Sequence, residues 1–257
     1  YLKELFASEE FGTNSRFRFE ALADLREHMR DLGQVDENLL ARLRERISEV
    51  LGTPPERRVR FRSSSNVEDA IEFNGAGLYD SCTHREDEGH LAKSIKQVFA
   101  SLWNYRAVEE REFYRIDHLT TAMGVLIHPN FDEELANGVA VTDDILYQTE
   151  GTYYVNTQVG EDLVTNPEEE SVPEELLLDW FNTRESKLMR RSNRTDKEQI
   201  LDPGQLDQLR VSLGIIHNRF AKLYGHSYED ESFAMEIEFK ITKDGKFSIK
   251  QARPWVY

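Results

Sequence analysis

Two runs of alternating apolar and polar residues near the C-terminal end constrain the fold most. A period of two is typical of a β-strand with one buried face. The runs lie in SFAMEIEFKITKDGKFSIKQARPW and meet at Asp244-Gly245, a dipeptide typical of tight hairpin turns. We therefore expect an antiparallel hairpin, and with it a sheet that must be covered on its apolar face.

The polar positions of this hairpin suggest a binding site. Glu236 and Glu238 are two positions apart on the first strand, and Gln251 and Arg253 are two apart on the second, so each pair shares a face. A two-residue loop would set Glu238 opposite Gln251 and Glu236 opposite Arg253. Carboxylate and amide oxygens are ligands that Mg²⁺ prefers, and arginine suits a phosphate.

A second register of the same hairpin is open. A three-residue loop pairs Ile241 with Phe247 and Phe239 with Ile249, which favours the apolar face and separates the polar set. A glutamate opposite an arginine on an exposed face is also ordinary surface electrostatics. The sequence does not decide between these registers.

The rest of the chain predicts helices before and between strands. We expect a helical lead-in over 1–55, a sheet-containing core over 56–172 and 226–257, and a helical segment over 173–225. One long helix is predicted from Leu91 to Arg115, and its charged run EEREFYR is typical of a solvated surface. The fold class is α+β, a mainly antiparallel sheet covered by helices with a helical lobe, in one domain over 1–257.

Composition limits the classes of partner. The 32 Lys and Arg residues against 48 Asp and Glu residues give a net charge of −16, which argues against nucleic-acid and membrane-surface binding. The single cysteine, Cys82, excludes a disulfide framework and indicates a reducing, cytoplasmic compartment. The chain begins with Tyr1 rather than Met, so we expect a fragment of a longer protein.

The stretch Arg62-Ser63-Ser64-Ser65 allows two interpretations. Ser65 and Glu68 have the spacing of a capping box, which satisfies the free backbone donors at a helix start. A helix N-terminus flanked by serine hydroxyls and by Arg62 is also suited to an anion. The two interpretations are compatible.

Several stretches, in order, resemble the pyruvate phosphate dikinase and phosphoenolpyruvate synthase family. FRSSSNVED…FNGAGLYDS is similar to V-R-S-S-A-x-x-E-D…G-x-x-x-(S/T), and FASLWNYRAVEEREFYR to S-L-W-x-x-R-A-x-x-Y-R. MEIEFKITKDGKFSIKQARPW is similar to D-I-E-W…G-x-L-x-I-L-Q-A-R-P. Weaker matches lie between them, and GAGLYDS resembles the glucan dikinase branch. The resemblance covers Arg60 to Pro254.

The resemblance implies an ATP-grasp domain that binds Mg-ATP and phosphorylates a histidine on a separate domain, which passes the group to pyruvate, a glucan or another acceptor. It implies that Glu238 and Gln251 hold magnesium and that Arg253 stabilises the transferring phosphoryl group. Glu236 stands where the family often has aspartate, at the ribose or the metal. Phosphoryl transfer needs mainly positioning and charge cancellation, which these residues could supply.

On the same resemblance, Arg62 and Arg106 meet the phosphates, and the turn with Ser63 and Ser64 is both cap and phosphate cradle. The chain also departs from the family. A glycine-rich segment with an ATP-contacting lysine is expected before Tyr1, and no T-S-H phosphohistidine motif occurs. The alternative is therefore a catalytically inactive relic that serves as a binding or regulatory module for a basic partner.

Overall fold

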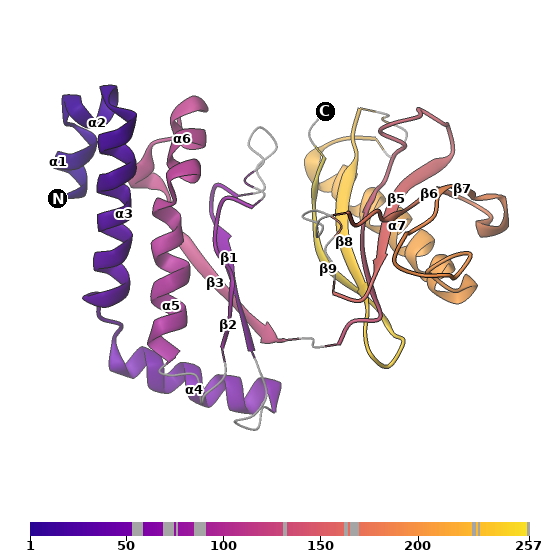
Figure 1. Ribbon diagram of the computed structural model, residues 1–257, viewed down its shortest axis with the longest axis horizontal. Helices are drawn as coiled ribbons and strands as arrows, with labels where there is room; N and C mark the ends of the chain where they lie inside the picture. Colours follow the sequence, from indigo (N-terminus) through magenta and orange to yellow (C-terminus); the bar gives the residue numbers. More distant parts are fainter. Residues whose placement is uncertain are drawn as a thin grey trace. The chain divides into compact units, whose positions relative to one another are not determined.

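The chain forms two compact units, Tyr1–Asn130 and Phe131–Tyr257, each with its own sheet. The computed structural model describes residues 1–52, 59–68, 75, 77–84, 91–130, 133–161, 164, 170–227, 230 and 232–255 (Figure 1). Both sheets are antiparallel and both carry helices, so the α+β class is confirmed. The single domain over 1–257 stays a prediction, and each unit is described here by itself.

The first unit combines helices with a small sheet of strand order β2-β1-β3. The helices predicted before Val50 are present as α1 to α4, and Gly52 ends α4 in the left-handed conformation with φ 55°. The elements of the unit are α1 Leu2–Phe6, α2 Glu9–Thr13, α3 Ser15–Asp31, α4 Glu37–Leu51, β1 Val59–Ser65, β2 Cys82–His84, α5 Leu91–Ala100, α6 Tyr105–Phe113 and β3 Met123–Pro129.

Strand β1 is the middle strand of the small sheet, and its alternation separates an apolar face from a polar one. Val59 and Phe61 are buried in one cluster with Ile95 and Val98 of α5. Arg60 lies between Val59 and Phe61 in the strand, so its side chain projects from the opposite face. Helix α5 therefore covers one face of the small sheet, and the arginines lie on the other.

The long helix predicted from Leu91 to Arg115 is interrupted. Helix α5 ends at Ala100, a 3-10 turn covers Ser101–Trp103, and α6 starts at Tyr105 after Asn104 leaves the helical region with ψ 136°. The Asn104 side chain explains the break, because its amide donates to Leu78 O at 3.0 Å and its Oδ1 accepts from an arginine of α3. Tertiary hydrogen bonds outweigh helix propensity here.

The second unit contains a large sheet of strand order β7-β6-β5-β4-β8-β9 and one long helix. The predicted C-terminal hairpin is present, and strands also form in NGVAVTD and TYYVNTQVG, within the range where a sheet-containing core is expected. The elements of the unit are β4 Ala136–Val141, β5 Thr152–Val159, β6 Glu174–Asp179, β7 Lys187–Arg190, α7 Pro203–Tyr224, β8 Met235–Ile241 and β9 Phe247–Pro254.

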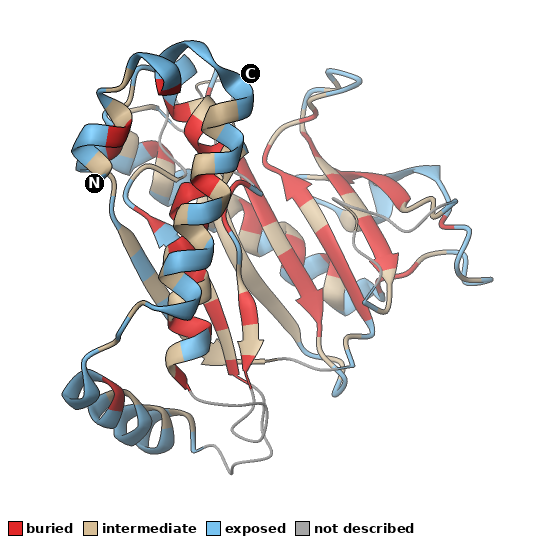
Figure 2. Cartoon of the chain, turned by 60° about the vertical axis from the view of Figure 1, so that its left-hand side comes forward, coloured by how far each residue is buried: buried red, intermediate tan, exposed pale blue. Residues whose placement is uncertain are grey.

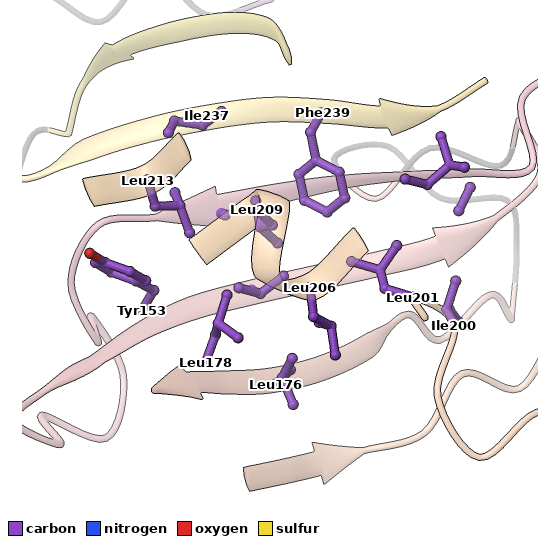
Figure 3. Packing of buried hydrophobic residues seen from close by; sticks show 14 residues of the cluster. Tyr153, Leu176, Leu178, Ile200, Leu201, Leu206, Leu209, Leu213, Ile237 and Phe239 are labelled. Carbon is purple, nitrogen blue, oxygen red and sulfur yellow. The ribbon is translucent and has the colours of Figure 1, made fainter. Parts of the chain in front are cut away.

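Helix α7 covers one face of the large sheet (Figure 3). Its start is fixed by Pro203 in the first turn and by a capping box in which Asp202 and Gln205 exchange hydrogen bonds. Leu209 and Leu213 of the helix pack in one cluster with Ile237 and Phe239 of β8. Neither α7 nor any other helix in the described ranges is long and apolar enough to cross a membrane.

The helical segment predicted over 173–225 is wrong in its first part. Residues Glu174–Asp179 form β6, which pairs with β5, and Lys187–Arg190 form β7, which pairs with β6. Leu176, Leu177 and Leu178 are all buried, so the run has no polar face that could reveal the strand. A short continuous apolar run cannot be distinguished from a buried helix by periodicity. Only the part from Pro203 onward is the predicted helix.

Candidate functional site

The C-terminal hairpin adopts both registers that the sequence left open. Near the turn Ile241 pairs with Phe247 and Phe239 with Ile249, as a three-residue loop requires. The register then shifts between Glu238 and Phe239, so that Glu238 pairs with Gln251 further along. A β-bulge thus inserts one residue into β9, and such bulges occur often beside functional sites because they redirect side chains.

Beyond the bulge, the hairpin brings together the four polar residues singled out in the sequence. Glu236 pairs with Arg253 in the register, and the Arg253 Nη2 group donates a hydrogen bond to Glu236 Oε1. The two side chains are 9% and 10% exposed, so this is a nearly buried ion pair. Glu238 lies directly opposite Gln251 on the same face. The predicted grouping of these residues is confirmed, whereas their roles stay predictions.

A second charged group on this face was missed by the sequence analysis. Lys240 Nζ lies 3.2 Å from Glu134 Oε1, and Lys250 Nζ lies 3.4 Å from the same oxygen. Lys240 could have been found, because it is two positions after Glu238 and shares its face. Glu134 precedes β4, so its meeting with a residue 106 positions later depends on the sheet topology. No sequence pattern predicts that contact.

The donor set at Glu238 and Gln251 fits a hard cation such as Mg²⁺. One carboxylate and one amide oxygen belong to the ligand class that magnesium accepts, and magnesium commonly keeps waters and substrate phosphates in its remaining positions. Within the described residues, no three His, Cys, Asp or Glu side chains gather as a metal site. A cation here would thus depend on oxygens from a bound ligand.

In the first unit, the serine-rich stretch forms the end of a strand. Arg62, Ser63 and Ser64 all lie in β1, where Arg62 is opposite Leu126 and Ser63 is opposite Val125 of β3. Strand alternation puts Arg62 and Ser64 on one face and Ser63 on the other. The three side chains thus do not share one face of β1, and their role as an anion site stays a prediction.

The backbone of Ser63 connects the strand to a neighbouring stretch of the chain. Its backbone N–H donates to the Ser81 hydroxyl at 3.2 Å, which joins β1 to the LYDS stretch. Gly77, just before that stretch, has φ +70°, a conformation for which glycine is suited. The loop and the strand are thus held together at Ser63 and Ser81.

The capping box predicted at Ser65 and Glu68 forms as a turn at the end of β1. The Ser65 hydroxyl accepts from the Val67 N–H at 3.3 Å, and the Glu68 carboxylate accepts from the Ser65 N–H at 3.4 Å. The helix that this box was predicted to start falls on residues outside the described ranges. The hydrogen bonds nevertheless fix the chain where it leaves the strand.

Arg60 joins Arg62 on the polar face of the small sheet. Arg60 Nη1 donates to Thr83 Oγ1 at 2.9 Å, and burial lowers the pKa of its guanidinium, with Arg62 acting in the same direction. The alternation of RRVRFRS would have placed both arginines on one face, so this partner could have been found. Two neighbouring cations make this face suited to an anion.

Arg106 lies in the first turn of α6, where it is exposed. The first unit thus holds Arg62 and Arg106, and the second holds the hairpin residues.

The charged run in α6 is not simply a solvated surface. Arg111 is fully buried and donates to Tyr79 Oη at 3.1 Å, to Leu102 O at 2.7 Å and to His118 Nδ1 at 3.1 Å. His118 Nε2 in turn lies 2.7 Å from Glu112 Oε1. Burial lowers the pKa of His118, and Arg111 adds to this effect while Glu112 opposes it. This buried network joins α6 to other segments of the first unit.

Comparison with known proteins agrees with the resemblance. The profile of a family described as the AMP/ATP-binding domain of pyruvate phosphate dikinase matches residues 18–256. A phosphoenolpyruvate synthase of Aeropyrum pernix is 38% identical over 72 residues, which cover 28% of this chain and 9% of that protein. A probable phosphoenolpyruvate synthase of Methanocaldococcus jannaschii is 24% identical over 203 residues, which cover 76% of this chain and 17% of that protein. The matches thus span less than a fifth of either relative.

Proposed function

The chain belongs to the AMP/ATP-binding domain family of pyruvate phosphate dikinase, and we propose that it binds Mg-ATP for a phosphotransfer reaction. The phosphoryl group goes to a histidine on a separate domain, in the same longer protein or in trans. From that histidine it passes to an acceptor such as pyruvate or a glucan. The observation that carries the proposal is the pairing of Glu236 with Arg253 and of Glu238 with Gln251 on one strand pair.

An ATP-grasp architecture is part of this proposal. Its support is that each unit has an antiparallel sheet with one face on a helix and the other face polar. In the small sheet the polar face carries Arg60 and Arg62, and in the large sheet it carries Glu238 and Arg253. Such faces suit a ligand that bears both phosphates and a metal ion.

In the proposed reaction, the hairpin residues bind and orient. Glu238 and Gln251 would hold magnesium, which when bound offsets the negative charge of the phosphates. Arg253 would meet the transferring phosphoryl group, and its ion pair with Glu236 fixes the direction of the guanidinium beforehand. A preorganised cation of this kind stabilises developing charge without reorganisation during the reaction.

The polar residues of the first unit would contact the phosphates. Arg62 and Arg60 supply positive charge from one face of the small sheet, and Ser64 shares that face. Arg106 is exposed at the start of α6 and could approach an anion from there. Ser63 is also proposed as a phosphate contact; its hydroxyl projects from the opposite face of the strand, and its backbone N–H donates to Ser81 Oγ.

Calorimetric titration with ATP and MgCl₂, with EDTA as a control, tests the proposal. We expect metal-dependent binding that Glu238→Ala weakens strongly. Glu198→Ala removes the same side chain at a position that is 89% exposed, and it should bind like the parent. Arg253→Lys keeps a cation opposite Glu236 but loses the planar guanidinium, so we expect weaker binding with the fold retained.

Two outcomes would contradict parts of the proposal. If Glu238→Ala and Arg253→Lys bind like the parent, the assignment of the site to the hairpin is wrong. If the 257-residue chain binds no ATP in the presence of MgCl₂, the inactive binding or regulatory module is favoured.

A further inference from the structure

The bulge in β9 introduces one residue, Lys250, that has no cross-strand partner in the register. Ile249 pairs with Phe239 and Gln251 pairs with Glu238, so Lys250 lies between two paired positions. In a bulge the extra residue leaves the ladder and its side chain is redirected. The hairpin keeps its apolar contacts and its polar pairs only because this residue is present.

The side chain of Lys250 extends along the polar face of the large sheet, the face away from α7. Its Nζ lies 3.4 Å from Glu134 Oε1, the oxygen that Lys240 Nζ approaches to 3.2 Å. Lys240 alternates with Ile241 and Phe239, which pack toward α7, so Lys240 and Glu134 lie on the polar face. Lys250 therefore shares this face with Glu238.

The two lysines differ in how firmly they are held. Lys240 is 3% exposed and Glu134 is 10% exposed, so they form a buried ion pair that is already neutral. Lys250 is 24% exposed and adds a second positive charge to the same carboxylate at a longer distance. A partly exposed ion pair of this kind contributes little to stability. Two lysines and one glutamate give this group a formal net charge of +1.

We propose that Lys250 is a phosphate-binding residue of the nucleotide site. It contacts a phosphate of ATP beyond the one that is attached to the ribose. This inference rests on the proposed function, because it needs the nucleotide to lie at Glu238 and Gln251. Lys250 immediately precedes Gln251 in the strand, so its flexible stem starts beside the metal ligands. Magnesium at those ligands would be shared with substrate phosphates.

The exchange that binding requires is chemically simple. The Lys250 ammonium leaves Glu134 for a phosphate oxygen, and Glu134 stays neutralised by Lys240. No charge is left buried without a partner, so the switch avoids the cost of an unpaired buried carboxylate. The hairpin pattern of the resembling family has leucine just before its glutamine, whereas this chain has Lys250. A phosphate contact from this position would therefore distinguish this chain from the family pattern.

Calorimetry on Lys250→Gln, Lys250→Arg and Lys246→Gln, with ATP and AMP in MgCl₂, tests the inference. A charge-assisted hydrogen bond corresponds to roughly a tenfold change in affinity or more, so we expect Lys250→Gln to weaken ATP binding by about that factor. AMP binding should change less, and Lys250→Arg should restore part of the ATP affinity. Lys246 is 80% exposed at the turn of the same hairpin, and Lys246→Gln should bind like the parent.

The outcomes separate this inference from the proposed function. If the parent chain binds ATP and Lys250→Gln binds it equally well, the inference is overturned and the proposed function stands. The same conclusion holds if Lys250→Gln and Lys246→Gln weaken binding equally, since that is a general charge effect. If the parent chain itself binds no ATP, both the proposed function and this inference are contradicted. Melting temperatures of the variants verify that the fold is retained.

Discussion

The small sheet and the large sheet are both antiparallel with one face covered by a helix, but the charged residues on their polar faces differ. The registers of β1, β2 and β3 place Arg60 and Arg62 on the face away from α5, and no carboxylate occupies the paired positions of those described strands. On the large sheet, Glu236 and Arg253 neutralise each other, and Figure 2 shows that much of this sheet is buried. In the described strands, the small sheet thus has arginines without carboxylates at the paired positions, whereas the large sheet pairs an arginine with a glutamate.

The contrast predicts that the same substitution has different costs in the two sheets. Arg253→Ala leaves Glu236 buried without its partner and should lower the free energy of unfolding by about 3–5 kcal/mol. Arg62→Ala should cost about 1 kcal/mol or less, because Arg62 is only half-buried.

Urea unfolding followed by tryptophan fluorescence measures both effects. Trp103 reports on the first unit, and Trp180 and Trp255 report on the second, so Trp→Phe backgrounds isolate each one. If Arg253→Ala and Arg62→Ala lower the free energy of unfolding by the same amount, the ion pair of the large sheet does not stabilise the fold as expected.

Two glycines, one in each sheet, allow the packing density of the sheets to be compared. A Cβ at Gly138 of β4 would lie 2.3 Å from Phe239 Cζ and 2.5 Å from Asn156 O, so Gly138→Ala should cost about 1–3 kcal/mol. At Gly124 of β3 the nearest atom, Ser64 O, is 3.1 Å away, so Gly124→Ala should cost clearly less. Thermal melts of both variants test this order, and a reversed order would contradict closer packing in the large sheet.

A smaller effect concerns the loop beside the small sheet. Ser81→Ala removes the acceptor of the Ser63 N–H and should cost about 0.5–1.5 kcal/mol. Ser64→Ala serves as the matched control, because Ser64 is exposed on the neighbouring position of the same strand. Chemical denaturation of both variants, read at Trp103, decides whether Ser81 fastens the loop to β1.

The two units should also respond oppositely to mild acid. Burial lowers the pKa of His118 in the first unit below its ordinary 6.5, so the unfolded state takes up protons first and stability falls as the pH drops through 6.5. Burial raises the pKa of Glu174 in the second unit above 4.5, so the folded state takes up protons first and stability rises as the pH falls toward that raised value.

Urea unfolding between pH 7 and pH 5, read at each unit's tryptophans, checks these signs. The effects are the smallest expected, because each comes from one group. His118→Asn should flatten the profile of the first unit, and Glu174→Gln that of the second. Parallel profiles in the two parent units would show that other groups dominate.

Much of the fold could be predicted because local patterns and tertiary contacts agree. The period of two in β1 and β8 and the cap and proline of α7 each specify their element locally. The strand β6 could not be predicted, since its three consecutive leucines are buried on both faces and only pairing with β5 distinguishes it from a helix. The break at Asn104 likewise depends on Leu78, which is distant in sequence.

The part of the candidate site that could be predicted is the part in which side chains alternate along one strand. Alternation grouped Glu236 with Glu238 and Gln251 with Arg253, and it could have added Lys240. It also implies that Ser63 and Arg62 face opposite ways, which the serine-rich pattern obscured. The Glu134 contact could not be predicted, because it depends on how β4 comes to lie beside β8.

Because of the bulge at Lys250, the number of residues in β9 decides which side chains pair across the hairpin. A single-residue deletion on the turn side of the bulge would shift Phe247 and Ile249 relative to β8, while the pairing of Gln251 and Arg253 could be kept. Deleting Lys250 itself would force one register on the whole hairpin, so either the apolar contacts or the polar pairs would be lost. Insertions and deletions in β9 should therefore be tolerated in compensating pairs, one at the turn and one at the bulge.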